Sequence, residues 1–315
     1  MTRACRVLVY HPELGEALAY ARLIRRPPGV TVHVCATAEE AAPLIDEAEV
    51  LYAWGFPASL LARARRLRWY QVMGAGVERA LVPELPKGVK VTRVAGIFGS
   101  WMAEYTLGWC FWVAQGMDGF RARQRERRWR PVDPRRLRGQ TLCVVGLGDI
   151  GADIAATARA IGMNVVGVSR SGRRLGAARK VYRTAAIREA LAQADFCVLT
   201  VPLTPATRGL LGAPELAAMK PTAWLINVAR GAVVDEPALV EALTSRSIGG
   251  AILDVFHTEP LPPSHPFWTL DNVVVTPHIS GPSVPIEIAP IFGDNLRRHL
   301  SGRPLRFQVD PRRGY

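Results

Sequence analysis

Arg230, Glu259 and His278 each follow the end of a predicted strand, and together they have the chemistry needed to reduce a keto acid. A histidine charged near neutral pH can give a proton to the alkoxide that forms when hydride reaches a ketone. A carboxylate against the far imidazole nitrogen would keep that histidine protonated and oriented. A planar arginine would bind the carboxylate of such a substrate.

Each of these residues also has a purely structural interpretation, which is the better one when each is taken singly. His278 could be a satisfied loop histidine after Pro277, Glu259 a solvated residue before a proline, and Arg230 a cap on its loop. His257 is the nearest competitor to His278, but it lacks the Thr-Pro-His context at a strand end. No constellation is recognisable around the remaining histidines, which are His11, His33, His265 and His299.

A glycine fingerprint for dinucleotides lies upstream, in the segment TLCVVGLGDIG. Gly146 allows a tight turn, Gly148 lets the backbone approach a pyrophosphate, and Gly151 lets the helix pack on the strand. The same spacing would fit any glycine-rich turn between a strand and a helix. The flanks favour the dinucleotide site, because a strand, a helix and a second strand are predicted at 142–145, 150–161 and 164–168.

The strand after the fingerprint lacks the acidic residue that would hold the ribose 2′-hydroxyl of NAD. It ends at Ser169-Arg170-Ser171, and Arg173 and Arg174 follow. An arginine can grip a 2′-phosphate and serine hydroxyls can donate hydrogen bonds to it. We therefore predict that NADP(H) is preferred over NAD(H), with NAD(H) still possible. The alternative is a basic solvated turn in an arginine-rich protein.

Alternating apolar runs and helical patterns predict an α/β protein with two doubly wound parallel sheets. One domain is expected to combine residues 1–98 and 286–315, and a dinucleotide-binding domain is expected at 99–285. A long apolar helix is predicted at 99–116, and the arginine-rich run 121–130 is interpreted as its solvated end. Strands are predicted at 6–10, 30–35, 49–53, 70–73, 89–94, 142–145, 164–168, 196–201, 224–228, 251–255 and 273–276.

Composition limits the possible partners and compartments. The formal net charge is +13, yet lysine occurs only at 87, 90, 180 and 220, so arginine usage accounts for the charge without a nucleic-acid partner. The cysteines are odd in number and widely spaced, which favours buried reduced thiols over disulfides or metal ligands. The chain shows neither a secretory leader nor an 18-residue apolar span, so we expect a cytoplasmic protein without a membrane partner.

The chain resembles the D-isomer-specific 2-hydroxyacid dehydrogenases, and among them the glyoxylate and hydroxypyruvate reductases. The resemblance spans nearly the whole length and is carried by the fingerprint and the three strand-end motifs. Three further motifs contribute, namely Gly74-Ala75-Gly76-Val77-Glu78, Met102-Ala103-Glu104-Tyr105 and Val201-Pro202-Leu203-Thr204.

This resemblance implies a role for each candidate residue. Arg230 would bind the substrate carboxylate and polarise the keto oxygen, His278 would be the acid/base, and Glu259 would pair with it. The amides of Ala75 and Gly76 would hold the carboxylate. The cofactor would be bordered by Asp149, Ile150, Val201, Pro202, Thr207, Val228, Ala229 and Ser280, and Asp254 would contact the nicotinamide carboxamide. A Rossmann coenzyme domain inserted into a flavodoxin-like substrate domain, and a homodimer, would be usual.

Two alternatives come from the same fold. Formate dehydrogenases share it, but a glutamine is expected where Glu259 stands. C-terminal binding protein corepressors bind NAD(H) and act through partner peptides, but this chain shows no long tail or peptide-docking extension. The sequence leaves open which keto acid is the substrate, although Trp54, Phe98 and Trp101 are candidates for lining its pocket or for ordinary core packing.

Overall fold

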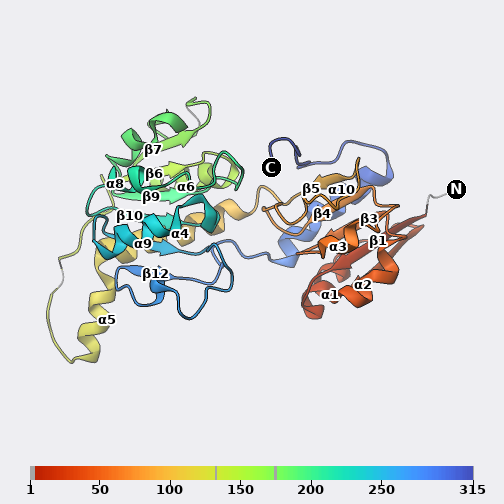
Figure 1. Ribbon diagram of the computed structural model, residues 1–315, viewed down its shortest axis with the longest axis horizontal. Helices are drawn as coiled ribbons and strands as arrows, with labels where there is room; N and C mark the ends of the chain where they lie inside the picture. The colour runs from red at the N-terminus through yellow and green to blue at the C-terminus, as the bar shows by residue number, and fades with distance from the viewer. Residues whose placement is uncertain (1–3, 132, 174–175, 315) are drawn as a thin grey trace. The chain divides into compact units, whose positions relative to one another are not determined.

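The computed structural model describes residues 4–131, 133–173 and 176–314, and these form two compact units (Figure 1). The first unit holds the described residues up to Ile97 and those from Ser283 onward, and the second is Phe98–Pro282. The chain therefore leaves the first unit once and returns to it. The first unit ends at Ile97, one residue before the expected boundary at 98. The second unit ends at Pro282, three residues before the expected boundary at 285.

The first unit contains a five-stranded parallel sheet in the order β2-β1-β3-β4-β5. Its strands are β1 (Cys5–Tyr10), β2 (Val30–Cys35), β3 (Val50–Ala53), β4 (Trp69–Val72) and β5 (Lys90–Thr92). This is the strand order of flavodoxin-like sheets. The helices are α1 (Leu14–Arg22), α2 (Ala38–Ile45), α3 (Ala58–Leu61) and α10 (Pro285–Leu300).

Helix α10 joins the end of the chain to the sheet of the first unit. The ring of Phe292 stacks on Tyr52 and on Trp69, with centroids 4.1 and 5.1 Å apart. One turn further along, the amide of Asn295 donates to Gln71 on β4 at 3.2 Å. Large buried aromatic rings contribute much apolar area, so this helix is an integral part of the core.

The second unit contains a seven-stranded sheet in the order β12-β11-β10-β9-β6-β7-β8, in which every pairing is parallel. The strands are β6 (Thr141–Val145), β7 (Asn164–Ser169), β8 (Lys180–Arg183), β9 (Phe196–Leu199), β10 (Trp224–Asn227), β11 (Gly250–Leu253) and β12 (Val273–Val275). The order reverses between β6 and β9, and ligands bind such sheets at the carboxyl ends beside that point. Strand β8 was not predicted from the sequence.

Six α-helices are described in the second unit, namely α4 (Phe98–Gln115), α5 (Met117–Arg125), α6 (Asp149–Ala160), α7 (Ile187–Leu191), α8 (Ala213–Ala217) and α9 (Glu236–Thr244). Short 3-10 turns occur at Thr184–Ala186, Gly231–Val233 and Pro266–Trp268. Across the described residues, no helix combines the length and the apolar character that crossing a membrane would require.

The helix predicted at 99–116 agrees with α4 to within one residue, but the interpretation of 121–130 as its solvated end is wrong. Helix α4 stops at Gln115, and Gly116 takes a left-handed conformation with φ 61° before α5 begins. Glycine adopts this conformation without the steric penalty of a side chain, so the chain turns here. The arginine-rich run then falls partly on α5, which buries none of its side chains, and partly beyond it.

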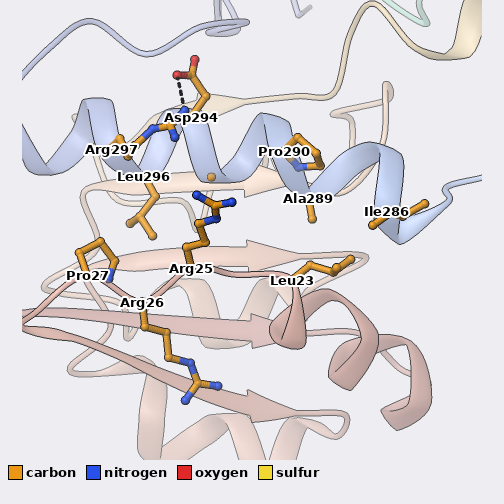
Figure 2. A pocket seen from close by; sticks show the side chains of 11 residues that line it. Leu23, Arg25, Arg26, Pro27, Ile286, Ala289, Pro290, Asp294, Leu296 and Arg297 are labelled. Carbon is orange, nitrogen blue, oxygen red and sulfur yellow. Dashed lines mark hydrogen bonds and ion pairs between the residues drawn. The ribbon is translucent and has the colours of Figure 1, made fainter.

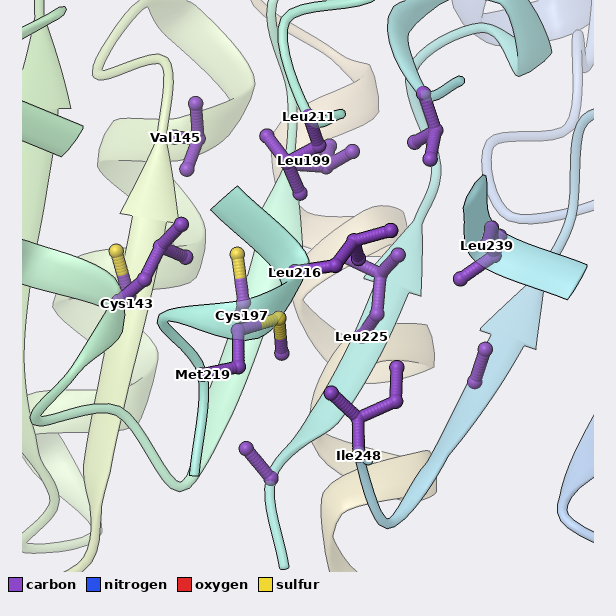
Figure 3. Close-up of a cluster of buried hydrophobic side chains, with 14 of the residues drawn as sticks. Cys143, Val145, Cys197, Leu199, Leu211, Leu216, Met219, Leu225, Leu239 and Ile248 are labelled. Atoms are coloured by element: carbon purple, nitrogen blue, oxygen red, sulfur yellow. The ribbon is translucent and has the colours of Figure 1, made fainter. Parts of the chain in front are cut away.

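The core of the second unit is continuous and apolar (Figure 3), with Cys143 on β6 and Cys197 on β9 side by side in the sheet. All five cysteines lie among the described residues, where each is buried and none forms a disulfide. The predicted burial of the cysteines is therefore confirmed.

Candidate active site

Asp254 organises the turn that carries His278. It follows β11, is fully buried, and accepts hydrogen bonds on both carboxylate oxygens. The donors are the Thr276 hydroxyl at 2.6 Å and the amides of Ile279 and Ser280 at 2.9 Å each. Three hydrogen bonds fix the position of this carboxylate. Because the three donors all belong to the turn after β12, the same hydrogen bonds fix the conformation of that turn.

A tyrosine from α4 supports this turn from the other side. The hydroxyls of Tyr105 and Thr276 are 2.6 Å apart, and Tyr105 is the donor because the Thr276 hydroxyl already donates to Asp254. Burial raises the pKa of Tyr105 to about 12, so the phenol keeps its proton near neutral pH. The Met-Ala-Glu-Tyr motif thus reaches the candidate site through a hydrogen-bond chain.

His278 has an unusual backbone conformation that this turn imposes. Its φ is 54°, in the left-handed region that few residues other than glycine adopt. The amide of His278 donates to the Asp254 carbonyl at 2.9 Å, which fixes the residue in place. Its side chain is 44% exposed, and Nδ1 lies 2.9 Å from Oε2 of Glu259. A conformation of this kind is often found where a side chain must be aimed at a ligand.

Glu259 is held at both oxygens, since Oε1 accepts from the amide of Phe256 at 3.0 Å and Oε2 faces His278. Burial opposes its ionisation, but the two hydrogen bonds and the charges of His278 and Arg230 outweigh burial and lower the pKa of Glu259. The carboxylate is therefore ionised near neutral pH. It fixes the proton of the imidazole on Nδ1, which leaves Nε2 to exchange a proton with a substrate.

Arg230 reaches the same edge of the sheet from β10. Asn227 closes its loop, accepting from the Ala229 amide at 3.1 Å and donating to the Arg230 carbonyl at 3.1 Å. A Cβ on Gly231 would overlap the main chain of Phe256, so only glycine lets this loop pack on the segment that leads to Glu259. The sequence prediction that the ends of three strands bring Arg230, Glu259 and His278 into one neighbourhood agrees with this geometry.

Two of the fingerprint glycines, Gly146 and Gly151, have the structural roles that the sequence predicts, and the surroundings of Gly148 leave room for its expected one. Gly146 has φ 105°, and a Cβ there would lie 2.9 Å from the Val201 side chain. A Cβ on Gly151 would overlap the carbonyl oxygen of Gly146, so this glycine brings α6 against the strand. A Cβ on Gly148 would meet no protein atom within 4 Å. Protein packing therefore does not require Gly148, whereas a pyrophosphate at the helix N-terminus would.

The other residues expected around the cofactor lie at the same strand ends. Asp149 and Ile150 form the first turn of α6. Thr207 donates to the Pro202 carbonyl at 2.6 Å and accepts from the Thr204 amide at 2.8 Å, so it shapes the loop after β9. Three further members of the set are buried, namely Val228, Ala229 and Ser280. A nicotinamide dinucleotide therefore fits the residues present.

The end of β7 carries the residues expected to choose the cofactor. Arg170 and Arg173 are exposed, and the hydroxyls of Ser169 and Ser171 accept from the amides of Gly172 and Arg173. Arg174 lies outside the described residues.

The structure adds Arg183, which the sequence analysis missed. It pairs in register with Ser169, and a Cβ on Gly172 would lie 2.7 Å from its Cγ. The strand Lys180–Arg183 is four residues long and its apolar residues are adjacent, so it carries no alternating pattern that would have predicted it.

The loop whose amides are expected to hold the substrate carboxylate belongs to the first unit. Trp54 follows β3, is 37% exposed, and packs on Gly74, where an added Cβ would meet its ring at 2.6 Å. Ala75 and Gly76 come next and are partly exposed. Trp54 and the glycine-containing loop are thus neighbours. Phe98 and Trp101 begin α4 in the second unit, where Phe98 is buried and Trp101 is 40% exposed.

The histidines left without a role in the sequence analysis have defined surroundings. His257 Nε2 lies 3.0 Å from the Val234 carbonyl, and His265 lies 3.3 Å from Glu236. The expectation that no constellation surrounds His299 is wrong. Its Nε2 is 2.7 Å from Glu49, and Cys5 lies within reach of both.

A cavity of about 620 Å³ lies in the first unit between the loop that follows α1 and helix α10 (Figure 2). Leu23, Pro27 and Leu296 are among its apolar lining residues, and Arg25 and Arg26 also line it. None of the predicted site residues lines it. Its size is ordinary for a ligand pocket.

Comparison with known proteins agrees with this site. The family model for the NAD-binding domain of D-isomer-specific 2-hydroxyacid dehydrogenases matches residues 107–280. The chain is 30% identical over 317 residues to glyoxylate/hydroxypyruvate reductase A of Photorhabdus laumondii, which covers 98% of this chain and 99% of that protein.

Two solved structures are similar over 99% of this chain and 100% of theirs. One is a D-isomer-specific 2-hydroxyacid dehydrogenase from Xanthobacter autotrophicus Py2 in complex with NADPH and MES, 36% identical with a TM-score of 0.88. The other is an NADPH-dependent glyoxylate/hydroxypyruvate reductase from Sinorhizobium meliloti in complex with NADP and sulfate, 30% identical with a TM-score of 0.89.

The fold and the site define the class of protein, a two-domain α/β oxidoreductase with a nicotinamide cofactor bound at a Rossmann sheet. The chain belongs to the D-isomer-specific 2-hydroxyacid dehydrogenase family. The expected fold, a Rossmann coenzyme domain inserted into a flavodoxin-like substrate domain, is confirmed. The activity at this level is oxidation and reduction of a small 2-hydroxy acid and its keto acid.

Proposed function

We propose that this protein is an NADPH-dependent 2-keto acid reductase acting on glyoxylate or hydroxypyruvate. The observation that carries the proposal is the contact of 2.9 Å between Nδ1 of His278 and Oε2 of Glu259. Both residues follow strands of the second sheet, and the loop after the neighbouring strand β10 carries Arg230. The names of the Photorhabdus and Sinorhizobium relatives support the substrate class.

The chemistry of the proposed reaction follows from the proton on Nδ1 of His278. The ionised Glu259 holds that proton, so a second proton on Nε2 is the one given to the developing alkoxide. Arg230 binds the substrate carboxylate and polarises the keto oxygen. Asp254 positions His278 through its turn, and we also propose that it meets the nicotinamide carboxamide. The bound cofactor supplies the hydride.

In the first unit we propose a carboxylate-binding loop. Ala75 and Gly76 follow β4 at its carboxyl end, and their amides are the proposed donors to the substrate. Trp54 packs beside this loop and would border the variable group of the keto acid. Reduction rates with glyoxylate, hydroxypyruvate, pyruvate and phenylpyruvate would test the substrate. The proposal expects the first two to be the better substrates, and a clear preference for phenylpyruvate would refute it.

Cofactor preference is proposed to depend on three arginines at the ends of β7 and β8. Arg170, Arg173 and Arg183 are exposed around the turn that follows Ser169, and their charges suit a 2′-phosphate. No carboxylate of the turn 169–173 would repel that phosphate. The NADPH and NADP complexes of the two solved relatives support the same preference.

Arg170→Asp is expected to lower kcat/KM for NADPH by roughly ten- to a hundredfold, because a charge-assisted contact to phosphate is lost. Efficiency with NADH should change little. Arg183→Gln should show a smaller loss in the same direction. Steady-state kinetics with both cofactors measure these ratios, and Arg66→Asp, at an exposed arginine of the first unit, controls for the change in charge. Equal efficiencies in the wild type, or an unchanged ratio in Arg170→Asp, would contradict the assignment.

A homodimer through α4 and α5 is proposed from exposed apolar side chains. Phe111, Met117 and Phe120 are each at least 40% exposed, and Gly108 on the same stripe of α4 leaves room for close approach. Exposed apolar area of this kind marks an interface in soluble proteins. Phe111→Asp should shift the mass in solution, measured by light scattering, from dimer to monomer. Ile286→Asp, at an exposed apolar residue of α10, should leave the dimer intact. A monomeric wild type would contradict the proposal.

A further inference from the structure

Three metal-ligating side chains meet in the first unit, in the cluster formed by Cys5, Glu49 and His299. One donor atom from each lies within 4.8 Å of the other two. Cys5 begins β1, Glu49 immediately precedes β3, and His299 lies in the last turn of α10. The residues are far apart in the sequence, so this convergence is a product of the fold.

We propose that Cys5, Glu49 and His299 bind a zinc ion. Thiolate, imidazole and carboxylate are the donor types that zinc takes in proteins. In a tetrahedral site with zinc bond lengths of about 2.0–2.3 Å, neighbouring donors are about 3.3–3.6 Å apart. Nε2 of His299 and Oε1 of Glu49 are 2.7 Å apart, and all three donors fall inside 4.8 Å. Small side-chain movements are therefore enough to surround the ion.

The site is enclosed and its backbone is fixed. Cys5 is 1% exposed, and the side chains of Glu49 and His299 are 16% and 13% exposed. The amide and carbonyl of Glu49 bond to Arg6 and Arg68 at 2.9 Å each. The ring of Trp69 lies beside His299, with centroids 5.7 Å apart. Ligands that are already in place lose little conformational freedom on binding, which favours affinity.

Charge balance favours a divalent cation here. With Cys5 as the thiolate, Glu49 ionised and His299 neutral, the donor set carries two negative charges, which zinc neutralises. Three protein ligands leave the fourth tetrahedral position for water. The cluster lies among residues of the first unit, whereas Arg230, Glu259 and His278 belong to the second. The ion would join β1, the start of β3 and α10, and would thus tie the returning end of the chain to the sheet.

The test uses the full chain without a histidine tag, stripped with a chelator and kept reduced. We would measure the zinc content of the protein after dialysis against zinc. The affinity for zinc would be measured by competition with a chromophoric chelator. Cobalt is then added as a spectroscopic probe, because a thiolate ligand gives a charge-transfer band. We expect one ion per chain, a thiolate–cobalt band, and a rise in Tm with zinc.

The variants Cys5→Ser, Glu49→Gln and His299→Gln should each weaken zinc binding at least tenfold, and Cys5→Ser should abolish the cobalt band. Cys35→Ser, at a buried cysteine of β2, and His33→Gln, at an exposed histidine of β2, should leave both unchanged. If Cys5→Ser does not fold, Glu49→Gln carries the test because it preserves size. The three ligand variants should bind NADPH as the wild type does. Absence of zinc binding to the wild type, or an affinity for zinc in the ligand variants equal to that of the wild type, would overturn the proposal.

Discussion

His278→Ala is expected to lower kcat for keto acid reduction by roughly 10²–10⁴-fold, the usual contribution of a positioned acid. Nδ1 of His278 lies 2.9 Å from the Glu259 carboxylate, so the proposed mechanism assigns the transferred proton to Nε2. Binding of NADPH, followed by fluorescence, should remain close to that of the wild type. His257→Ala is the matched control, because this neighbouring strand-end histidine bonds only to a backbone carbonyl among the hydrogen bonds described.

The His278–Glu259 pair also predicts how the reaction rate changes with pH. Reduction needs protonated His278, so its rate should fall as rising pH removes that proton, while oxidation of the hydroxy acid should rise. The pKa of Glu259 is lowered, so the carboxylate stays ionised into mildly acidic solution and supports the protonated imidazole there. Glu259→Gln should move the fall in reduction rate to lower pH. An intact rate in His278→Ala, or an unmoved profile in Glu259→Gln, would remove the pair from the mechanism.

Arg230→Lys is expected to lower kcat/KM for keto acids on the order of 10²-fold although the charge is retained. A compact ammonium cannot reproduce the planar contact with a carboxylate, nor hold a donor at the keto oxygen. The closed loop that Asn227 and Gly231 form should keep the fold, so cofactor affinity should change little.

Arg246→Lys is the control for the arginine substitution. One guanidinium nitrogen of Arg246, Nη2, donates to both carboxylate oxygens of Asp271 at 2.6 and 2.8 Å on an exposed surface, where ion pairs contribute little. This variant should reduce keto acids at the rate of the wild type. Near-normal turnover in Arg230→Lys would show that Arg230 does not bind the substrate.

The fold and the catalytic neighbourhood could be predicted because both depend on local sequence patterns. Gly146 has φ 105° in the turn between β6 and α6, and Gly151 packs on the Gly146 carbonyl, so both are needed within one local strand–turn–helix segment. The alternation of apolar runs and helical patterns identifies parallel sheets. Residues that follow parallel strands gather at one edge of the sheet, so Arg230 and His278 could be placed together without coordinates.

Other features depend on contacts between distant segments, and the sequence could not reveal them. Arg183 becomes a neighbour of Ser169 only when β8 pairs with β7, and the short strand Lys180–Arg183 has little periodicity to detect. His299 meets Glu49 because α10 returns to the first sheet. The break between α4 and α5 is local, since Gly116 supplies it, but an interior glycine alone does not distinguish a break from a tolerated residue.

The most direct test of the proposed function is the steady-state reduction of hydroxypyruvate by NADPH, with NADH measured in parallel and the product resolved by chirality. The account predicts turnover with a kcat/KM for NADPH at least tenfold above that for NADH, and the D-hydroxy acid as product. Tight NADPH binding without turnover of any 2-keto acid, as expected for an interaction protein on this fold, would contradict it.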